Sequence, residues 1–69
     1  MTDTLGDALP REMARVRDEV LPVYRDIGPS GMFAATMMRR DLDLAAKALA
    51  EGDVVAMLAI HESLKSWQL

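Results

Sequence analysis

Apolar side chains recur at helical spacing along most of the chain. In the first long segment they follow one another at intervals of four, three, four, three and four residues, which lays a single stripe along one helix face. The stripe consists of Leu9, Met13, Val16, Val20, Val23 and Ile27. It predicts a helix over about residues 10–27, beginning at Pro10, which has no amide hydrogen and suits the first turn of a helix. The charged opposite face favours ion pairs of Arg15 with Asp18 and Glu19.

Pro22 interrupts this first helix. Its ring would meet the carbonyl of Asp18 and its nitrogen cannot donate, which costs about 3 kcal/mol inside an ordinary helix. The helix must therefore bend or break near Leu21. Because the apolar stripe continues through Val23 and Ile27, we favour one bent helix over two shorter helices.

Residues 1–8, which precede this helix, are short, polar and acidic. Thr4 and Asp7 offer a capping pair, but Gly6 weakens any helix between them. We therefore expect residues 1–8 to form a mobile lead-in.

A second helix is predicted over about residues 32–51. Gly28-Pro29-Ser30-Gly31 supplies a helix stop, a rigid turn residue and a serine suited to capping the helix that follows. This second helix is apolar on two faces, so it should contact two neighbours and form the centre of the fold. Its two stripes are Ala35, Met38, Leu42, Ala45 and Leu49 on one face, and Phe33, Met37, Leu44 and Ala48 on the other.

A third helix is predicted over about residues 54–67, after the two-residue junction Gly52-Asp53. Glycine can close the second helix in the left-handed conformation and aspartate can cap the third. The third helix carries Met57, Ile60, Leu64 and Trp67 on one stripe, with Val54, Leu58 and His61 beside it. The predicted fold is all-α: a single small three-helix domain over residues 1–69, built as a helical hairpin plus a kinked N-terminal helix.

The composition gives this domain more apolar surface than it can easily hide. Hydrophobic residues make up 51% of 69 residues, including six methionines, while a chain of this size buries only about 60% of the surface that its unfolded form exposes. The chain has no cysteine and one histidine, which excludes disulfides and most zinc frameworks as supports. Oligomerisation or a protein partner remains as the expected support, with a homodimer as the leading form.

Charge and hydropathy exclude several classes of function. The net charge of −3 disfavours binding to nucleic acid, because lysine and arginine must replace the counterions of its phosphates. Asp53-Val54-Val55-Ala56 at the start of the third helix would repel phosphate and could not read base edges. No apolar run approaches the roughly 20 residues that span a bilayer, and the acidic N-terminus does not resemble a signal peptide. A cytoplasmic protein is expected.

No constellation of catalytic or metal-ligating residues is evident. His61 is the only histidine and has no carboxylate at helical spacing beside it, so we interpret it as a surface or hydrogen-bonded histidine. Asp41 and Asp43 point in different directions on a helix, which favours solvated side chains over a carboxylate dyad. We therefore expect no enzyme, no cofactor, no metal and no small-molecule substrate, and we keep catalysis or metal binding through His61 as a minor alternative.

The methionine-rich start of the second helix is the feature in which a binding role competes with core packing. Methionine adapts to irregular partner surfaces. The candidate protein-contact residues are Met32, Phe33, Met37, Met38, Leu44 and Trp67.

Four segments resemble short acidic proteins of unknown function from proteobacterial genomes, which are often encoded in prophages or integrated mobile elements. The segments are Leu9-Pro10-Arg11-Glu12, Ile27-Gly28-Pro29 with Gly31, Met37-Met38-Arg39 with Asp41-Leu42, and Gly52-Asp53-Val54-Val55-Ala56-Met57. The resemblance implies a bacterial setting and no site residues.

The leading functional hypothesis is a non-enzymatic protein that binds a partner protein or itself. One alternative is a phage or mobile-element inhibitor that occludes a basic surface of a host complex, as anti-CRISPR proteins do. Another is a purely structural role.

Overall fold

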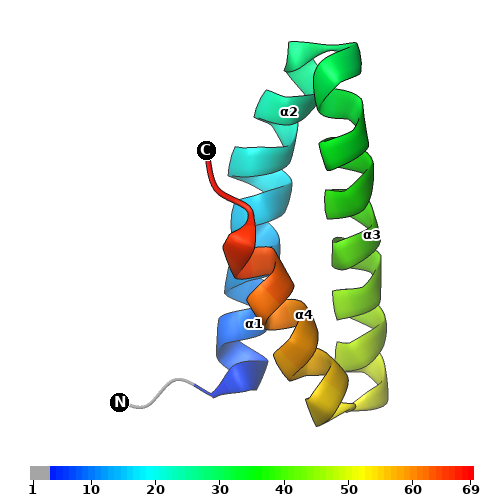
Figure 1. Cartoon of the computed structure of the whole chain (residues 1–69). Coiled ribbons are helices and arrows are strands. Elements are labelled where there is room, and N and C mark those ends of the chain that lie inside the picture. The colour runs from blue at the N-terminus through cyan, green and yellow to red at the C-terminus, as the bar shows by residue number, and fades with distance from the viewer. Residues whose placement is uncertain (1–3) are drawn as a thin grey trace.

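The computed structural model describes residues 4–69, and nearly all of them are helical. Helix α1 (Leu5–Arg15), the π-helical turn η1 (Val16–Val20) and α2 (Leu21–Ile27) follow one another without a gap and form one long N-terminal helix (Figure 1). Helix α3 spans Pro29–Glu51 and α4 spans Val54–Ser66. The predicted small all-α domain is confirmed.

The N-terminal helix and α3 form an antiparallel hairpin, and α4 folds back against it. In Figure 1, α4 lies alongside the second half of α3 and crosses α1, while the C-terminus runs toward α2. Helix α4 packs against both α1 and α3. The molecule is elongated, with extents of 38 × 24 × 15 Å, and the half of the hairpin near the α2–α3 turn has no third helix over it.

The first helix begins at Leu5, five residues earlier than predicted. Thr4 caps it: the Asp7 amide donates to Thr4 Oγ1 at 3.2 Å, and the Thr4 amide donates to Asp7 Oδ2 at 3.4 Å. This reciprocal capping box offsets the cost of Gly6. The prediction of a mobile lead-in is therefore wrong for residues 5–8, and residues 1–3 lie outside the described part of the chain.

The π-helical turn η1 precedes Pro22 and changes which face of the helix is buried. The Leu21 amide bonds to the Val16 carbonyl, five residues back. Because a π turn holds more residues than an α turn, every later side chain is rotated by about 100° relative to a continuous α-helix. The predicted stripe is therefore wrong beyond Val20: Val23 and Ile27 are 43% and 55% exposed.

After the π turn, Leu21 and Tyr24 face the interior instead. Leu21 is buried, and Tyr24 packs against the buried core.

The turn between α2 and α3 depends on two glycines. Gly28 has φ +99°, a conformation that favours glycine, and Pro29 occupies the first turn of α3. The prediction that Ser30 caps this helix is wrong: the N-cap is Gly28, and Ser30 lies inside the helix. Gly31 lies so close to α2 that a Cβ atom there would be 2.0 Å from the Tyr24 carbonyl oxygen.

The turn between α3 and α4 has the predicted chemistry. Gly52 adopts the left-handed conformation with φ +65°, and the Asp53 carboxylate accepts a hydrogen bond from the Ala56 amide at 3.1 Å. The two residues reverse the chain and fix the start of α4. Helix α4 ends at Ser66, and Trp67 is already extended.

The core lies between the N-terminal helix, α3 and α4, and it is built from small and medium side chains. Its buried members are Leu9, Val16, Val20, Leu21, Ala35, Met38, Ala45, Ala48, Met57, Ile60 and Leu64. The three alanines all lie on α3, where they allow the other helices to approach closely.

Candidate protein-binding surface

A buried carboxylate on α3 holds the C-terminal end of α4. Asp41 Oδ2 accepts hydrogen bonds from Ser63 Oγ at 2.7 Å and from Trp67 Nε1 at 2.9 Å. Asp41 is only 8% exposed, so the prediction that it is solvated is wrong. The reason is tertiary: Asp41 lies on the α3 flank that faces α4, where Ser63 and Trp67 supply both donors.

Two further polar contacts hold the end of α4 against the N-terminal helix. Arg15 donates to the Leu64 carbonyl at 3.0 Å and to Glu12 Oε2 at 2.8 Å, so it does not make the predicted pairs with Asp18 and Glu19. The Tyr24 hydroxyl donates to the Gln68 carbonyl at 3.3 Å. Together with Asp41, these contacts set the angle of α4 across the hairpin.

We expect Asp41→Ala to destabilise the fold by about 2 kcal/mol, because hydrogen bonds to a charged group contribute about 1.5–3 kcal/mol. Thermal unfolding by circular dichroism measures the loss, and fluorescence of Trp67, the only tryptophan, should shift to longer wavelength in the folded variant. Asp41→Asn keeps one oxygen acceptor and should lose less. Unfolding of Asp41→Ala at the wild-type temperature would contradict this role.

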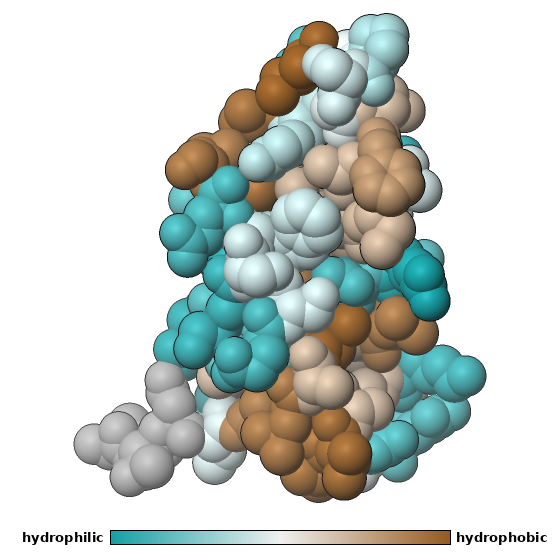
Figure 2. Space-filling view, viewed as in Figure 1, coloured by the Kyte–Doolittle hydropathy of each residue, from teal (hydrophilic) through white to brown (hydrophobic). Residues whose placement is uncertain are grey.

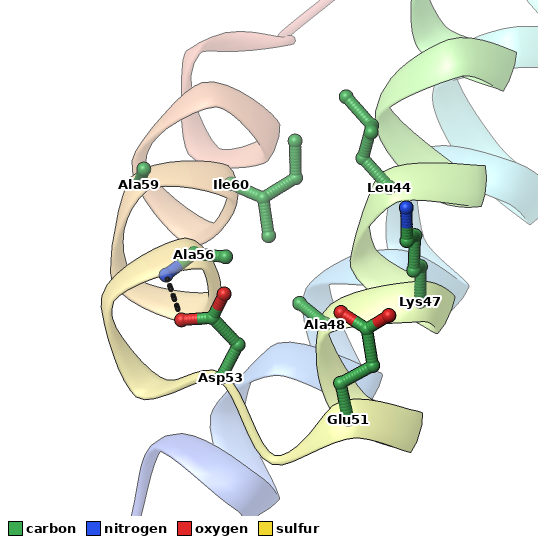
Figure 3. Close-up of a pocket in the computed structure, with 8 residues that line it drawn as sticks. All are labelled: Leu44, Lys47, Ala48, Glu51, Asp53, Ala56, Ala59 and Ile60. Carbon is green, nitrogen blue, oxygen red and sulfur yellow. Dashed lines mark hydrogen bonds between the residues drawn. The ribbon is translucent and has the colours of Figure 1, made fainter.

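The placement of α4 leaves an open groove between α3 and α4 (Figure 3), which we call the α3/α4 groove. Its volume is about 380 Å³. One wall comes from α3 and the other from α4, and the Gly52-Asp53 turn closes one end. The lining residues are Leu44, Lys47, Ala48, Glu51, Asp53, Ala56, Ala59 and Ile60. Three alanines make it hollow, and its charged residues all come from α3 and the adjoining turn.

A row of side chains on α3 continues from this groove to the opposite end of the helix. Its members recur at intervals of four, three, four, three and four residues, so they share one side of the helix. We call this row the α3 edge: Phe33, Met37, Arg40, Leu44, Lys47 and Glu51. All are exposed except Met37, which is half-buried, and Phe33 is 79% exposed.

The structure separates the six candidate contact residues into three groups. Met32, Phe33 and Leu44 are exposed, and Phe33 and Leu44 lie on the α3 edge. Met37 and Trp67 are half-buried, with the indole N–H of Trp67 bonded to Asp41. Met38 is 0% exposed, so its assignment as a contact residue is wrong: it lies on the stripe of α3 that faces the N-terminal helix.

Exposed apolar residues on α4 were absent from the predicted surface. Val54, Val55 and Leu58 are exposed on α4, and Figure 2 shows hydrophobic side chains gathered over the first half of α4 and again near the α2–α3 turn. The signal in the sequence was the surplus of apolar residues at the start of α4. Only the packing of the helix shows which of them face solvent.

The exposed charges on the N-terminal helix and α4 are mostly mixed in sign. Arg17 pairs with Asp18 at 2.8 Å and Arg25 with Asp26 at 3.5 Å. The hydrogen bond from Arg17 lowers the pKa of the Asp18 carboxyl. On α3, by contrast, Arg40, Asp43 and Lys47 have no ion pair within residues 4–69.

Within residues 4–69, no three histidine, cysteine, aspartate or glutamate side chains are grouped so that they could hold a metal ion. None of the helices in this range is long and apolar enough to cross a membrane. His61 is half-buried on α4. No family model, curated protein or solved structure matches the chain.

Proposed function

We propose that this protein acts by binding another protein chain through the α3 edge and the α3/α4 groove, without catalysing a reaction. The observation that carries the proposal is the exposure of Phe33 on the same helix edge that leads into a groove with apolar walls. A large aromatic side chain in solvent costs free energy that burial against a partner recovers. Aromatic residues are also common anchors of protein interfaces.

The distribution of charge supports apolar recognition over an acidic surface that competes for a basic groove. Such a competitor needs a continuous face of negative charge to complement the basic groove. Three of the exposed acids, Asp18, Asp26 and Glu62, have a basic partner in the same chain, which reduces the negative field of the surface. Binding through the α3 edge should therefore persist at high salt, because the contacts of Phe33 and Met37 are apolar and are not screened.

Affinity capture with a matched pair of variants tests this function. Phe33→Glu places a charge on the α3 edge, and Ala46→Glu places the same charge at an exposed α3 position away from that edge. Immobilised wild type should retain protein, either its own untagged chain or a protein of a bacterial lysate, at both low and high salt. Phe33→Glu should lose most of that protein and Ala46→Glu should keep it.

Both substitutions are at exposed positions, so both variants should remain folded, which circular dichroism checks. Equal capture by the two variants, or capture that disappears at high salt, would contradict the proposed surface.

A further inference from the structure

We infer that the occupant of the α3/α4 groove is the Phe33 end of the α3 edge from a second copy of this chain. This inference rests on the proposed function, because it names the partner of the same surface. In the arrangement, two copies of α3 pack antiparallel around a two-fold axis, so that each copy gives Phe33 and Met37 to the groove of the other.

The register of the α3 edge supports this pairing. An antiparallel pair with its two-fold axis at the level of Leu42 places Phe33 level with the partner's Glu51, and Met37 level with the partner's Lys47. The groove lies beside Leu44 to Glu51. One axis therefore brings the most exposed aromatic residue of each copy to the groove of the other, as a closed two-fold interface requires.

The flanks of the two helices also match. A two-fold axis perpendicular to both helices keeps corresponding flanks on the same side of the pair. Met37 and Ala48 lie on the same flank of α3, the one that faces α4, because they are eleven residues, or about three turns, apart. Met37 therefore faces the partner's Ala48, which lines the partner's groove.

The position of α4 leaves room for this pairing. Helix α4 lies alongside only the second half of α3 (Figure 1). In an antiparallel pair, the two α4 helices therefore lie beside opposite halves of the α3 pair and do not overlap. Each α4 also extends the apolar wall that Phe33 and Met37 of the other copy meet, through Ala56 and Ala59.

Charge at the centre of the pair is complementary. The same axis places Arg40 level with the partner's Leu44, beside the partner's Asp43 on the same flank. Neither Arg40 nor Asp43 has an ion pair within residues 4–69. Two such contacts form across the axis. They favour the antiparallel pair over a parallel one, in which Arg40 of one copy would lie level with Arg40 of the other and repel it.

The α3/α4 groove is large enough for a side chain of the second copy. The groove volume of about 380 Å³ lies within the range of about 300–1,000 Å³ that ligand pockets occupy. It can receive an aromatic side chain.

Sedimentation equilibrium over a dilution series tests whether the second copy binds. Wild type and Ala46→Glu should both show twice the chain mass of 7.6 kDa. Phe33→Glu should raise the dissociation constant by roughly thirtyfold or more, as loss of an interface anchor does, and show the mass of a single chain. A monomeric wild type throughout the series would overturn the inference.

A monomeric wild type whose capture of another protein depends on Phe33 would overturn only the second copy as occupant and leave the proposed function standing. A monomer without any such capture would overturn both.

Cysteine pairs test the antiparallel register, since the chain has no cysteine of its own. Thr36 and Lys47 are exposed and lie about 16 Å apart along one helix, but in the proposed pair Thr36 lies within one residue of the level of the partner's Lys47. A mixture of Thr36→Cys and Lys47→Cys should cross-link with a short bismaleimide. Either variant alone should not. Cross-linking of Thr36→Cys to itself, or none in the mixture of dimeric variants, would overturn the register.

Discussion

Replacing Gly31 by alanine should lower the free energy of unfolding by about 3 kcal/mol or more, the upper range for overpacked sites. The added Cβ would lie 2.0 Å from the Tyr24 carbonyl oxygen and 3.2 Å from the Ile27 Cβ, so α3 and α2 would have to separate. The free energy of unfolding of a domain of this size is only about 3–10 kcal/mol, so the variant should be mostly or partly unfolded. Its melting temperature should fall by roughly 10–25 °C.

Gly6→Ala is the matched control for this prediction. A Cβ at Gly6 would meet only Thr4 Oγ1 at 3.6 Å, an ordinary contact, and alanine favours the helix by up to about 1 kcal/mol over glycine. The control should therefore melt at or slightly above the wild-type temperature. If Gly31→Ala melted within a few degrees of wild type, the close packing of α2 on α3 would be wrong.

Met38→Asp should prevent folding altogether. Met38 is fully buried, so the substitution loses about 2–5 kcal/mol of packing and places an unpaired carboxylate in the core at a cost of several kcal/mol more. The sum exceeds the expected stability of the domain. Far-ultraviolet circular dichroism should show little helix at neutral pH.

Met32→Asp is the control for this second prediction, because Met32 is exposed on the same helix and a surface substitution changes stability by about 0.5 kcal/mol or less. That variant should keep its helical spectrum. A folded Met38→Asp protein would place Met38 at the surface, in conflict with the packing of α3. The pair also shows that loss of binding in a Met38 variant would report unfolding and not loss of a contact.

Local signals in the sequence predicted the helix ends well where one residue type decides the conformation. Gly52 was assigned its turn role from its backbone freedom and Asp53 its cap role from its side chain, and both are confirmed. At the N-terminus, two local signals opposed each other. The Thr4–Asp7 capping box outweighed the poor helix propensity of Gly6, and their relative strengths could not be ranked from the sequence.

The burial pattern beyond Val20 could not be predicted, because it depends on a single extra residue in the turn before Pro22. The sequence indicated that Pro22 would disturb the helix, but a kink, a break and a π turn all satisfy that condition. The structure has the π turn, which rotates Tyr24 inward and Val23 outward. If the geometry of this one turn is predicted wrongly, the buried and exposed sides are predicted wrongly for every later residue of the helix.

The candidate site was predictable in part. The second apolar stripe of α3 indicated a surface beyond the core, and Phe33 and Leu44 are indeed exposed. Met38 and Asp41 were assigned to the surface because helical spacing does not say which stripe faces a neighbour. The α3/α4 groove depends on the angle of α4, which long-range contacts from Asp41 and Arg15 set, and no local pattern encodes that angle.

The most direct test of the central claim, that the Phe33 end of one α3 enters the α3/α4 groove of another chain, is a mixing experiment. Phe33→Glu keeps the groove and loses the aromatic anchor, whereas Ala59→Arg keeps the anchor and fills the groove with a long charged side chain at an exposed position. In a mixed pair, Phe33 of the Ala59→Arg chain can enter the unchanged groove of the Phe33→Glu chain. At the second site, the introduced carboxylate of one chain lies beside the introduced guanidinium of the other.

Sedimentation equilibrium of each variant alone and of an equimolar mixture measures the outcome. We predict that each variant alone has the mass of one chain and that the mixture has the mass of two. If the mixture stayed monomeric while wild type was dimeric, or if either variant alone remained a dimer, the seating of Phe33 in the partner's groove would be contradicted.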